Sequence, residues 1–221
     1  MSYIDAIKNR HSVRNYRAES IEDKKIEKIE ALITELNNEG NLHLQFIKDA
    51  GKTYNKLLNK AMGLASAPSV IACVGVDDGT LDQRIGYYGE KLVLDLQEMG
   101  LNTCWAGTFN QKNIGAEVKD GERLVISIAV GCGQDNGKPH KSKSAEAVID
   151  AKGDRPYWFN RGVEMALLAP TAINQQKFQI RLNEDDTVDF IDKGGPFSKV
   201  DIGIVMRHFE IGSEKDVKKP F

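Results

Sequence analysis

Two arginines flank a serine near the start of the chain, in the segment Arg10-His11-Ser12-Val13-Arg14. A guanidinium group is a planar fork of donors that matches the oxygens of a phosphate monoester, and a serine hydroxyl can donate one more hydrogen bond. Arg10, Ser12 and Arg14 are therefore candidate phosphate ligands. The alternative is a solvated basic turn after a short helix, because short basic motifs often occur by chance.

Three later segments carry groups that suit the same kind of ligand. Lys141-Ser142-Lys143 offers further phosphate donors, although both lysines could instead lie in a solvated loop. Asn174 and Gln176 carry carboxamides, which donate and accept together, as the mixed edge of a flavin pyrimidine ring requires; Asn174 could also simply cap a helix. In Trp105-Ala106-Gly107-Thr108, the glycine permits backbone N–H groups to approach a flat ring closely.

Composition excludes several kinds of partner. A net charge of -2 over 221 residues gives no general attraction to nucleic acid or to an anionic membrane. No apolar run approaches the ~20 residues of a membrane span. The first residues lack the features of a signal peptide, and an odd number of cysteines (Cys73, Cys104, Cys132) favours reduced thiols, so we expect a cytoplasmic location. The four histidines show no ligand spacing, and no metal site is expected.

Common catalytic signatures are missing from the sequence. There is no GxSxG elbow, no HExxH pair and no Walker A loop. Gly131-Cys132-Gly133 with Gly137 superficially matches a dinucleotide-binding fingerprint. However, Lys138-Pro139 follows at the point where a helix should begin on the pyrophosphate, which disfavours that interpretation.

Apolar periodicity predicts an α+β fold. We expect helices over 3–8, 21–40 (with Ser20 as its cap), 54–64, 81–99, 160–168 and 198–210 (with Ser198 as its cap). We expect strands over 42–47, 70–76, 101–105 and 124–130, and a hairpin formed by 178–182 and 188–191. The long apolar stripe of 81–99 predicts a central helix, and 214–221 is expected to be a loose tail. Residues 21–47 and 160–182 share the order helix, loop, strand, which indicates either an internal pseudo-repeat or chance.

Taken together, these segments resemble the motifs of the nitroreductase family of FMN enzymes, in particular a divergent branch like the putative nitroreductases of thermophilic bacteria. The similar segments are Arg10–Tyr16 (the family's N-terminal phosphate motif), Ala67–Ile71 (strand entry), Gly100–Phe109 (Gly-Leu-Gly-Thr-Cys-Trp-x-Gly-Gly-Phe), Lys141–Lys143 (late basic motif) and Ala169–Gln176 (Ala-Pro-Ser-x-x-Asn-x-Gln).

The resemblance implies a three-layer sandwich, in which helices flank a central, mainly antiparallel sheet. It also implies hydride transfer from NAD(P)H through FMN to a nitroaromatic, a quinone or a similar small-molecule acceptor, by a ping-pong mechanism without a catalytic side chain. A non-catalytic flavin-binding or regulatory protein of the same fold is the alternative. The implied cofactor-binding residues are Arg10, His11, Ser12, Arg14, Ala106, Gly107, Thr108, Lys141, Lys143, Asn174 and Gln176.

Two features depart from the family pattern. The motif that contains Asn174 lies near the end of the sequence instead of after the first long helix, and Lys177-Phe178 stands where Pro-Trp is usual. We therefore predict that residues 1–150 form an FMN-binding half and that residues 155–221 form a reduced second half that completes the flavin site. Such a chain would be a pseudo-dimeric monomer. A homodimer, the ordinary state of the family, is the other possibility.

Overall fold

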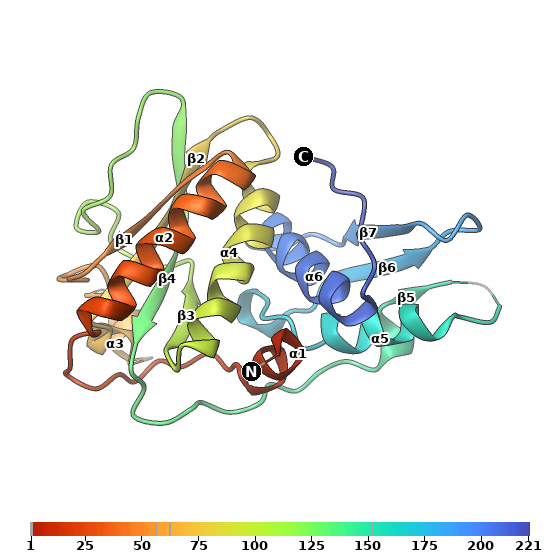
Figure 1. Cartoon of the computed structure of the whole chain (residues 1–221), viewed down its shortest axis with the longest axis horizontal. Helices are drawn as coiled ribbons and strands as arrows, with labels where there is room; N and C mark the ends of the chain where they lie inside the picture. The colour runs from red at the N-terminus through yellow and green to blue at the C-terminus, as the bar shows by residue number, and fades with distance from the viewer. Residues whose placement is uncertain (1, 56, 62, 152) are drawn as a thin grey trace. The chain divides into compact units, whose positions relative to one another are not determined.

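A computed structural model describes residues 2–221, except 56, 62 and 152 and the side chain of 58. The chain forms two compact units, and Figure 1 labels their elements. The first unit contains the described residues of 1–9, 82–91 and 140–221, and the second contains those of 10–81 and 92–139. Helix α4 (Leu81–Glu98) contributes to both units. The compact units are discontinuous in sequence, so they do not coincide with the predicted halves. The division of labour between residues 1–150 and 155–221 remains a prediction.

The second unit is built on a four-stranded sheet with the order β1-β2-β4-β3. Its strands are β1 (Leu42–Ile47), β2 (Ser69–Val76), β4 (Glu122–Gly131) and β3 (Asn102–Ala106). All three pairings are antiparallel, which confirms the expected α+β class with an antiparallel central sheet. Seven of the eight residues of β2 are buried, as its uninterrupted apolar sequence predicts.

Helix α2 (Asp23–Gly40) packs against β1 in this unit. The side chain of Asn37 fixes the pair, because its Oδ1 accepts from the backbone N–H of Leu44 at 2.7 Å and its Nδ2 donates to the Leu44 carbonyl at 3.0 Å. The prediction that Ser20 caps this helix is wrong. The helix begins at Asp23, after Glu22, without any side-chain cap.

The helix expected over 54–64 is shorter than predicted. The structure shows α3 (Leu57–Ala61) and a 3₁₀ turn, η1 (Leu64–Ser66), while residues 56 and 62 lie outside the described part of the chain. Gly63 separates the two because its φ of +85° is left-handed, a conformation that an α-helix cannot contain.

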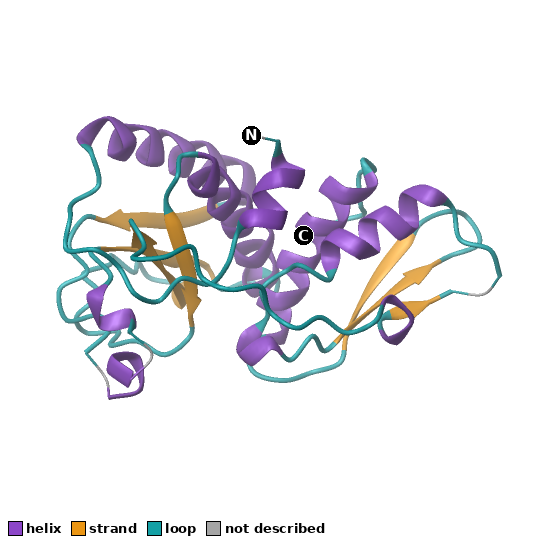
Figure 2. Ribbon diagram, turned by 90° about the horizontal axis from the view of Figure 1, so that it is seen from below, coloured by secondary structure: helices purple, strands orange, loops and turns teal. Residues whose placement is uncertain are grey.

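The first unit combines α-helices, including residues 82–91 of α4, with a three-stranded sheet. Figure 2 shows the helices in purple and the strands in orange. Its elements are α1 (Tyr3–Asn9), η2 (Ala145–Ala147), β5 (Ile149–Asp150), α5 (Tyr157–Ala166), η3 (Ala172–Asn174), β6 (Phe178–Leu182), β7 (Val188–Asp192) and α6 (Ser198–Ser213). The predicted antiparallel hairpin of β6 and β7 is confirmed, and β5 adds a parallel pairing to β6. The prediction that Ser198 caps α6 is wrong, because the residue before the helix is Phe197 in a left-handed conformation.

Residues 82–91 of α4 lie against α6 with little space between the backbones. A Cβ atom on Gly86 would meet the Val200 carbonyl oxygen at 2.0 Å, and one on Gly203 would meet the Gln83 carbonyl oxygen at 2.1 Å. Only glycine therefore fits at these two positions, which lets the two helices pack backbone to backbone.

A buried His–Glu pair also joins these helices. His208 and Glu90 are both 0% exposed, and His208 Nε2 lies 2.8 Å from Glu90 Oε1. His208 Nδ1 lies 3.1 Å from the carbonyl oxygen of Met165 in α5. A carbonyl can only accept, so Nδ1 must carry a proton, and one further proton is shared between Nε2 and Oε1. The pair is therefore neutral as a whole wherever that shared proton resides.

The end of the chain is packed, so the expectation of a loose tail is wrong. Val217 is 7% exposed, the ammonium group of Lys219 lies 3.3 Å from Glu210 Oε1, and the ring of Phe221 packs edge-on against Tyr87 at 5.8 Å between centroids. Aromatic area and an ion pair hold a segment whose composition alone indicated disorder. Among the described residues, no helix is long and apolar enough to cross a membrane.

Candidate functional site

The basic segment of the second unit is held by backbone pairing. The N–H of Val13 donates to the Thr103 carbonyl at 3.0 Å, and the N–H of Arg17 donates to the Cys132 carbonyl at 2.8 Å. Between them the Tyr16 ring is buried, and its hydroxyl donates to the Val13 carbonyl at 2.8 Å. Residues 12–17 therefore lie extended beside β3 and the end of β4, and this pairing fixes where each side chain emerges.

Three predicted site residues of this segment act on the Cys104 thiol of β3. Burial raises the pKa of that thiol, while the positive charges of Arg14 and Arg10 and a hydrogen bond from Ser12 oppose the increase. Ser12 also pairs with Thr103 of β3, so this basic segment lies beside that strand. Arg10 is buried and Arg14 is exposed. This donor set, two delocalised cations and one hydroxyl, suits a doubly charged phosphate group.

The predicted His11 lies at the same end of the unit. Its Cβ would be 2.9 Å from a Cβ on Gly137, whose φ is +73°. The loop that follows β4 therefore approaches the basic segment closely only because residue 137 has no side chain.

The loop Ala106–Thr108 follows β3 directly, and its two outer carbonyls are engaged. Ser127 Oγ donates to the Ala106 carbonyl at 3.0 Å, and Asn59 Nδ2 donates to the Thr108 carbonyl at 2.8 Å. Within the described part of the chain, the backbone N–H groups of Gly107 and Thr108 donate to no acceptor. Asn59 is fully buried and was not predicted from the sequence. The loop thus offers two backbone donors from a fixed position.

In the first unit, the structure brings Lys141 and Lys143 together with Asn174 and Gln176. Both carboxamides donate to the Lys141 carbonyl at 2.9 Å, and Gln176 Nε2 also donates to Asn174 Oδ1 at 2.7 Å. Gln176 Oε1 accepts from the backbone N–H of Lys143 at 2.8 Å. Gln176 is 2% exposed, and these bonds use all its polar groups. Asn174 is exposed and keeps one N–H for a ligand.

The loop that carries these carboxamides has an unusual backbone. Ile173, Asn174 and Gln176 have φ values of 49°, 54° and 45°. The left-handed region is rare for non-glycine residues and is a genuine outlier for a β-branched one. Ile173 is also 89% exposed, so its own packing does not compensate for the strain. Strained residues of this kind persist where the surroundings hold them, and they cluster at functional sites.

Asp201, in the first turn of α6, holds this loop through hydrogen bonds to its carboxylate. Its carboxylate accepts from the Ala172 N–H at 3.0 and 3.1 Å and from Gln175 Nε2 at 2.7 Å. Burial raises the pKa of Asp201 to about 6, although the hydrogen bonds from Gln175 and Ala172 oppose the shift. The sequence offered one signal that was missed. An aspartate between Val200 and Ile202 interrupts the apolar part of a helix.

The sequence matches the model of one protein family over nearly its whole length. Residues 2–213 match a family model described as "Putative TM nitroreductase". The chain belongs to this nitroreductase family. The family resemblance inferred from the sequence motifs is thereby confirmed. No curated protein matches the chain.

Solved structures of nitroreductases share the fold. A putative nitroreductase from Thermotoga maritima is 22% identical, with a TM-score of 0.68 over 96% of this chain and 83% of the other. A putative nitroreductase from Desulfovibrio desulfuricans, in complex with FMN, is 20% identical, with a TM-score of 0.52 over 70% of this chain and 97% of the other. An FMN-dependent nitroreductase from Clostridium difficile is 18% identical, with a TM-score of 0.50 over 62% of this chain and 91% of the other. These likenesses confirm the expected nitroreductase-like fold.

The predicted site residues of this nitroreductase-family chain fall into two sets. Arg10, His11, Ser12, Arg14, Ala106, Gly107 and Thr108 belong to the second unit, and Lys141, Lys143, Asn174 and Gln176 belong to the first. The four members in the first unit are joined by hydrogen bonds. Their action on one shared ligand is a proposal. Among the described residues, no group of three or more His, Cys, Asp or Glu side chains could hold a metal ion.

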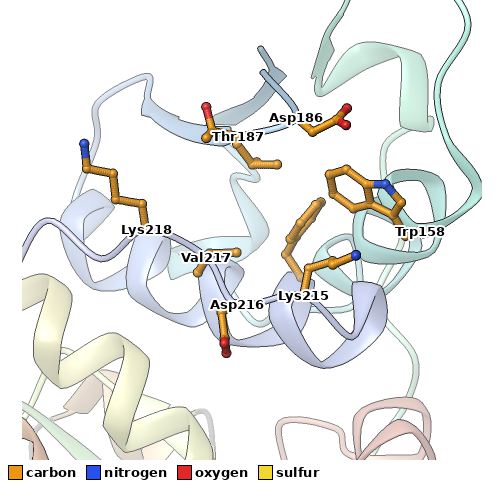
Figure 3. A pocket seen from close by; sticks show the side chains of 9 residues that line it. Trp158, Asp186, Thr187, Lys215, Asp216, Val217 and Lys218 are labelled. Carbon is orange, nitrogen blue, oxygen red and sulfur yellow. The ribbon is translucent and has the colours of Figure 1, made fainter. Parts of the chain in front are cut away.

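The first unit also contains a cavity of about 290 Å³ that none of the predicted site residues lines (Figure 3). Trp158 and Phe209 line it with aromatic rings whose centroids lie 6.4 Å apart. The side chain of Asp216 points away from the interior (Figure 3). The remaining lining residues are Asp186, Thr187, Val188, Lys215, Val217 and Lys218.

Proposed function

We propose that this chain is an FMN-dependent oxidoreductase that transfers hydride from NAD(P)H through FMN to a nitroaromatic, a quinone or a similar small acceptor. The observation that carries the proposal is that the segment with Arg10, Ser12 and Arg14 lies beside β3, where the two positive charges and the Ser12 hydroxyl act on the Cys104 thiol. Family membership supports an oxidoreductase role. Two structurally similar proteins, an FMN-dependent nitroreductase and a putative nitroreductase in complex with FMN, support this choice of cofactor.

In this proposal, the second unit holds the phosphate. Arg10 and Arg14 neutralise its charge, and Ser12 donates a hydrogen bond to it. His11 packs at the same place, and the backbone of Ala106–Thr108 lies against the ring. The unused N–H groups of Gly107 and Thr108 favour the negative charge that the ring gains on reduction.

In the same proposal, the first unit completes the site. Asn174 offers its remaining N–H to the ring, and Lys141 and Lys143 add positive charge near the phosphate. Gln176 keeps Asn174 and the lysines in place. The chain then acts as a pseudo-dimeric monomer, in which residues 155–221 complete the site formed by residues 1–150; the alternative is a homodimer.

FMN, when bound, supplies the hydride chemistry at N5, so no side-chain acid is required. The protein contributes binding, orientation and charge. A ping-pong order follows if donor and acceptor use the same face of the ring in turn. The cytoplasmic location also remains a prediction.

The test begins with purified protein. We expect a flavin absorbance spectrum and the release of FMN on heating. Under anaerobic conditions, NADPH or NADH should bleach the bound flavin, and a nitroaromatic should restore its colour. Protein that binds no FMN at micromolar concentrations would contradict the proposal. FMN that binds but resists reduction would instead support a non-catalytic flavin-binding protein, for which the exchange of Pro-Trp for Lys177-Phe178 leaves room.

A further inference from the structure

Asp201 is a buried carboxylate without a cation. It is 7% exposed, and no lysine or arginine among the described residues forms an ion pair with it. Among the described residues, the charge that acts on it is that of Asp192, at the end of β7, and this charge is repulsive. A buried carboxylate normally requires a cationic partner, because removing its charge from water is expensive. The presence of Asp201 therefore calls for an explanation other than stability.

Among the described residues, the hydrogen bonds that the Asp201 carboxylate accepts all come from one loop. The N–H of Ala172 and the carboxamide of Gln175 donate to it, and Gln175 Nε2 also contacts the Pro196 carbonyl at 3.0 Å. Ala172 precedes the strained residue Ile173, and Gln175 lies between the strained Asn174 and Gln176. The carboxylate thus holds the loop on both sides of the left-handed residues Ile173 and Asn174.

The same loop organises four of the proposed ligand residues. Asn174 and Gln176 hold the backbone of Lys141, and Gln176 holds the backbone of Lys143. A change in the conformation of residues 171–176 would therefore displace both carboxamides and both lysines together.

We propose that Asp201 is a positioning residue of the flavin site: its carboxylate holds residues 171–176 in the strained conformation that presents Asn174, Lys141 and Lys143 to the ligand. The inference rests on the proposed function. A carboxylate that served the fold alone would be expected to stabilise it, whereas the three hydrogen bonds to Asp201 define the loop and burial works against its charge.

The effect on stability follows from the direction of the pKa shift. The folded-state pKa of about 6 lies above the ordinary value of 3.8. The stability associated with this raised pKa is fully present below about pH 4 and is lost as the pH rises through 6. At pH 8 the ionised Asp201 therefore destabilises the folded chain. Replacing it by asparagine, which has the same shape and no charge, removes that cost.

The experiment compares Asp201→Asn with wild type in flavin titrations between pH 5 and pH 8. Riboflavin is used beside FMN, because a phosphate monoester itself titrates near pH 6 and riboflavin has none. We expect the wild type to bind riboflavin more weakly below pH 6, as its carboxylate becomes a poorer acceptor. Asp201→Asn should bind roughly tenfold more weakly than wild type at pH 8, the loss expected for one charge-assisted hydrogen bond, and should show a flat pH profile. Its thermal unfolding midpoint at pH 8 should be higher than that of wild type.

Asp192→Asn is the matched control. Asp192 accepts hydrogen bonds from Gly194 and Ser198 and from no residue of the 171–176 loop. This variant should keep wild-type flavin affinity at pH 8 and shift the midpoint of the pH profile downward, because a repulsive charge has been removed. Gln175→Ala removes only one of the bonds to Asp201, and it should lose roughly threefold in affinity. This second variant tests the inference even if Asp201→Asn fails to fold.

Each outcome decides something. Unchanged riboflavin affinity and an unchanged pH profile in Asp201→Asn would overturn the inference and leave the proposed function intact. Weaker binding together with a lower unfolding midpoint would show a structural role and also overturn it. Wild-type protein that binds neither flavin would overturn both the inference and the proposed function.

Discussion

Residues 10–17 of the second unit and residues 171–176 of the first unit carry the two sets of proposed ligand residues, and they are held in different ways. The first segment is extended, pairs through its backbone with β3 and β4, and contains no left-handed non-glycine residue. The second is a loop with three such residues, and side chains hold it. The Asp201 carboxylate accepts from its backbone, and the carboxamides of Asn174 and Gln176 donate to the Lys141 carbonyl.

The difference teaches where each segment is sensitive to substitution. A backbone-paired segment keeps its course when one of its side chains is changed, so substitutions there should alter ligand binding and leave stability unchanged. A loop held by side chains should lose its shape when one of them is removed. The following predictions test this contrast.

The largest effect is expected at the buried His208–Glu90 pair, which belongs to the same unit as the second segment. Glu90→Ala leaves the His208 imidazole buried without its partner, and it should lower the free energy of unfolding by about 3–5 kcal/mol. Glu90→Gln should lose only about 1 kcal/mol, because a carboxamide N–H can donate to Nε2 of a neutral His208. Urea unfolding measures both. Equal losses in the two variants would contradict the assigned protonation.

Removal of Gln176 should expose the dependence of the loop on side chains. Gln176→Ala breaks the side-chain bonds to Lys141 and Lys143 and should reduce the free energy of unfolding by about 2 kcal/mol. Gln179→Ala, a half-buried glutamine on β6, is the control. In the backbone-paired segment, Ser12→Ala should change stability by less than about 0.5 kcal/mol. If Ser12→Ala proved as costly as Gln176→Ala, the contrast between the segments would be wrong.

The basic segment should show the opposite response. Arg14→Ala should weaken FMN binding roughly thirtyfold, which corresponds to about 2 kcal/mol for a charge-assisted hydrogen bond, and leave riboflavin binding unchanged. Arg17→Ala is the matched control, because Arg17 is also exposed and lies three residues further on. Fluorescence titration measures affinity, and the unfolding midpoints of both variants should equal that of wild type. Equal loss of FMN and riboflavin affinity would argue against phosphate recognition by Arg14.

The smallest effect should have the opposite sign. Ile173→Asn exchanges a β-branched residue for one that tolerates the left-handed region, and it should raise the free energy of unfolding by about 0.5–1 kcal/mol. Leu57→Asn is the control, because Leu57 is similarly exposed, at 84% against 89%, and lies in a helix. A loss of stability in Ile173→Asn would show that the exposed isoleucine packs more than its exposure indicates.

Much of the fold could be predicted from the sequence. Continuous apolar runs correctly predicted strands β2 and β4, and the long apolar stripe of residues 81–99 correctly predicted helix α4. Helix starts were less predictable, since Ser20 and Ser198 match cap preferences that neither helix uses. The packed tail was missed because its aromatic partner, Tyr87, is distant in sequence.

In the candidate site, too, some residues could be predicted from the sequence and others could not. The phosphate motif could be identified from residue types alone, because its chemistry lies within five consecutive residues. The roles of Asp201 and Asn59 depend on contacts with loops 29 and 49 residues away, and no local pattern encodes such contacts. For Gln176 the sequence indicated a polar contact but not that the chain itself would use all of its hydrogen bonds.

The backbone-to-backbone contact of Gly86 with Gly203 has a consequence for directed evolution of this enzyme family member. Because Cβ atoms at these two positions would overlap carbonyl oxygens at 2.0 and 2.1 Å, even alanine should be rejected there. A random library selected for folded protein should therefore recover glycine at both codons while most of the surrounding surface varies freely, and libraries aimed at new acceptors should leave both codons unchanged.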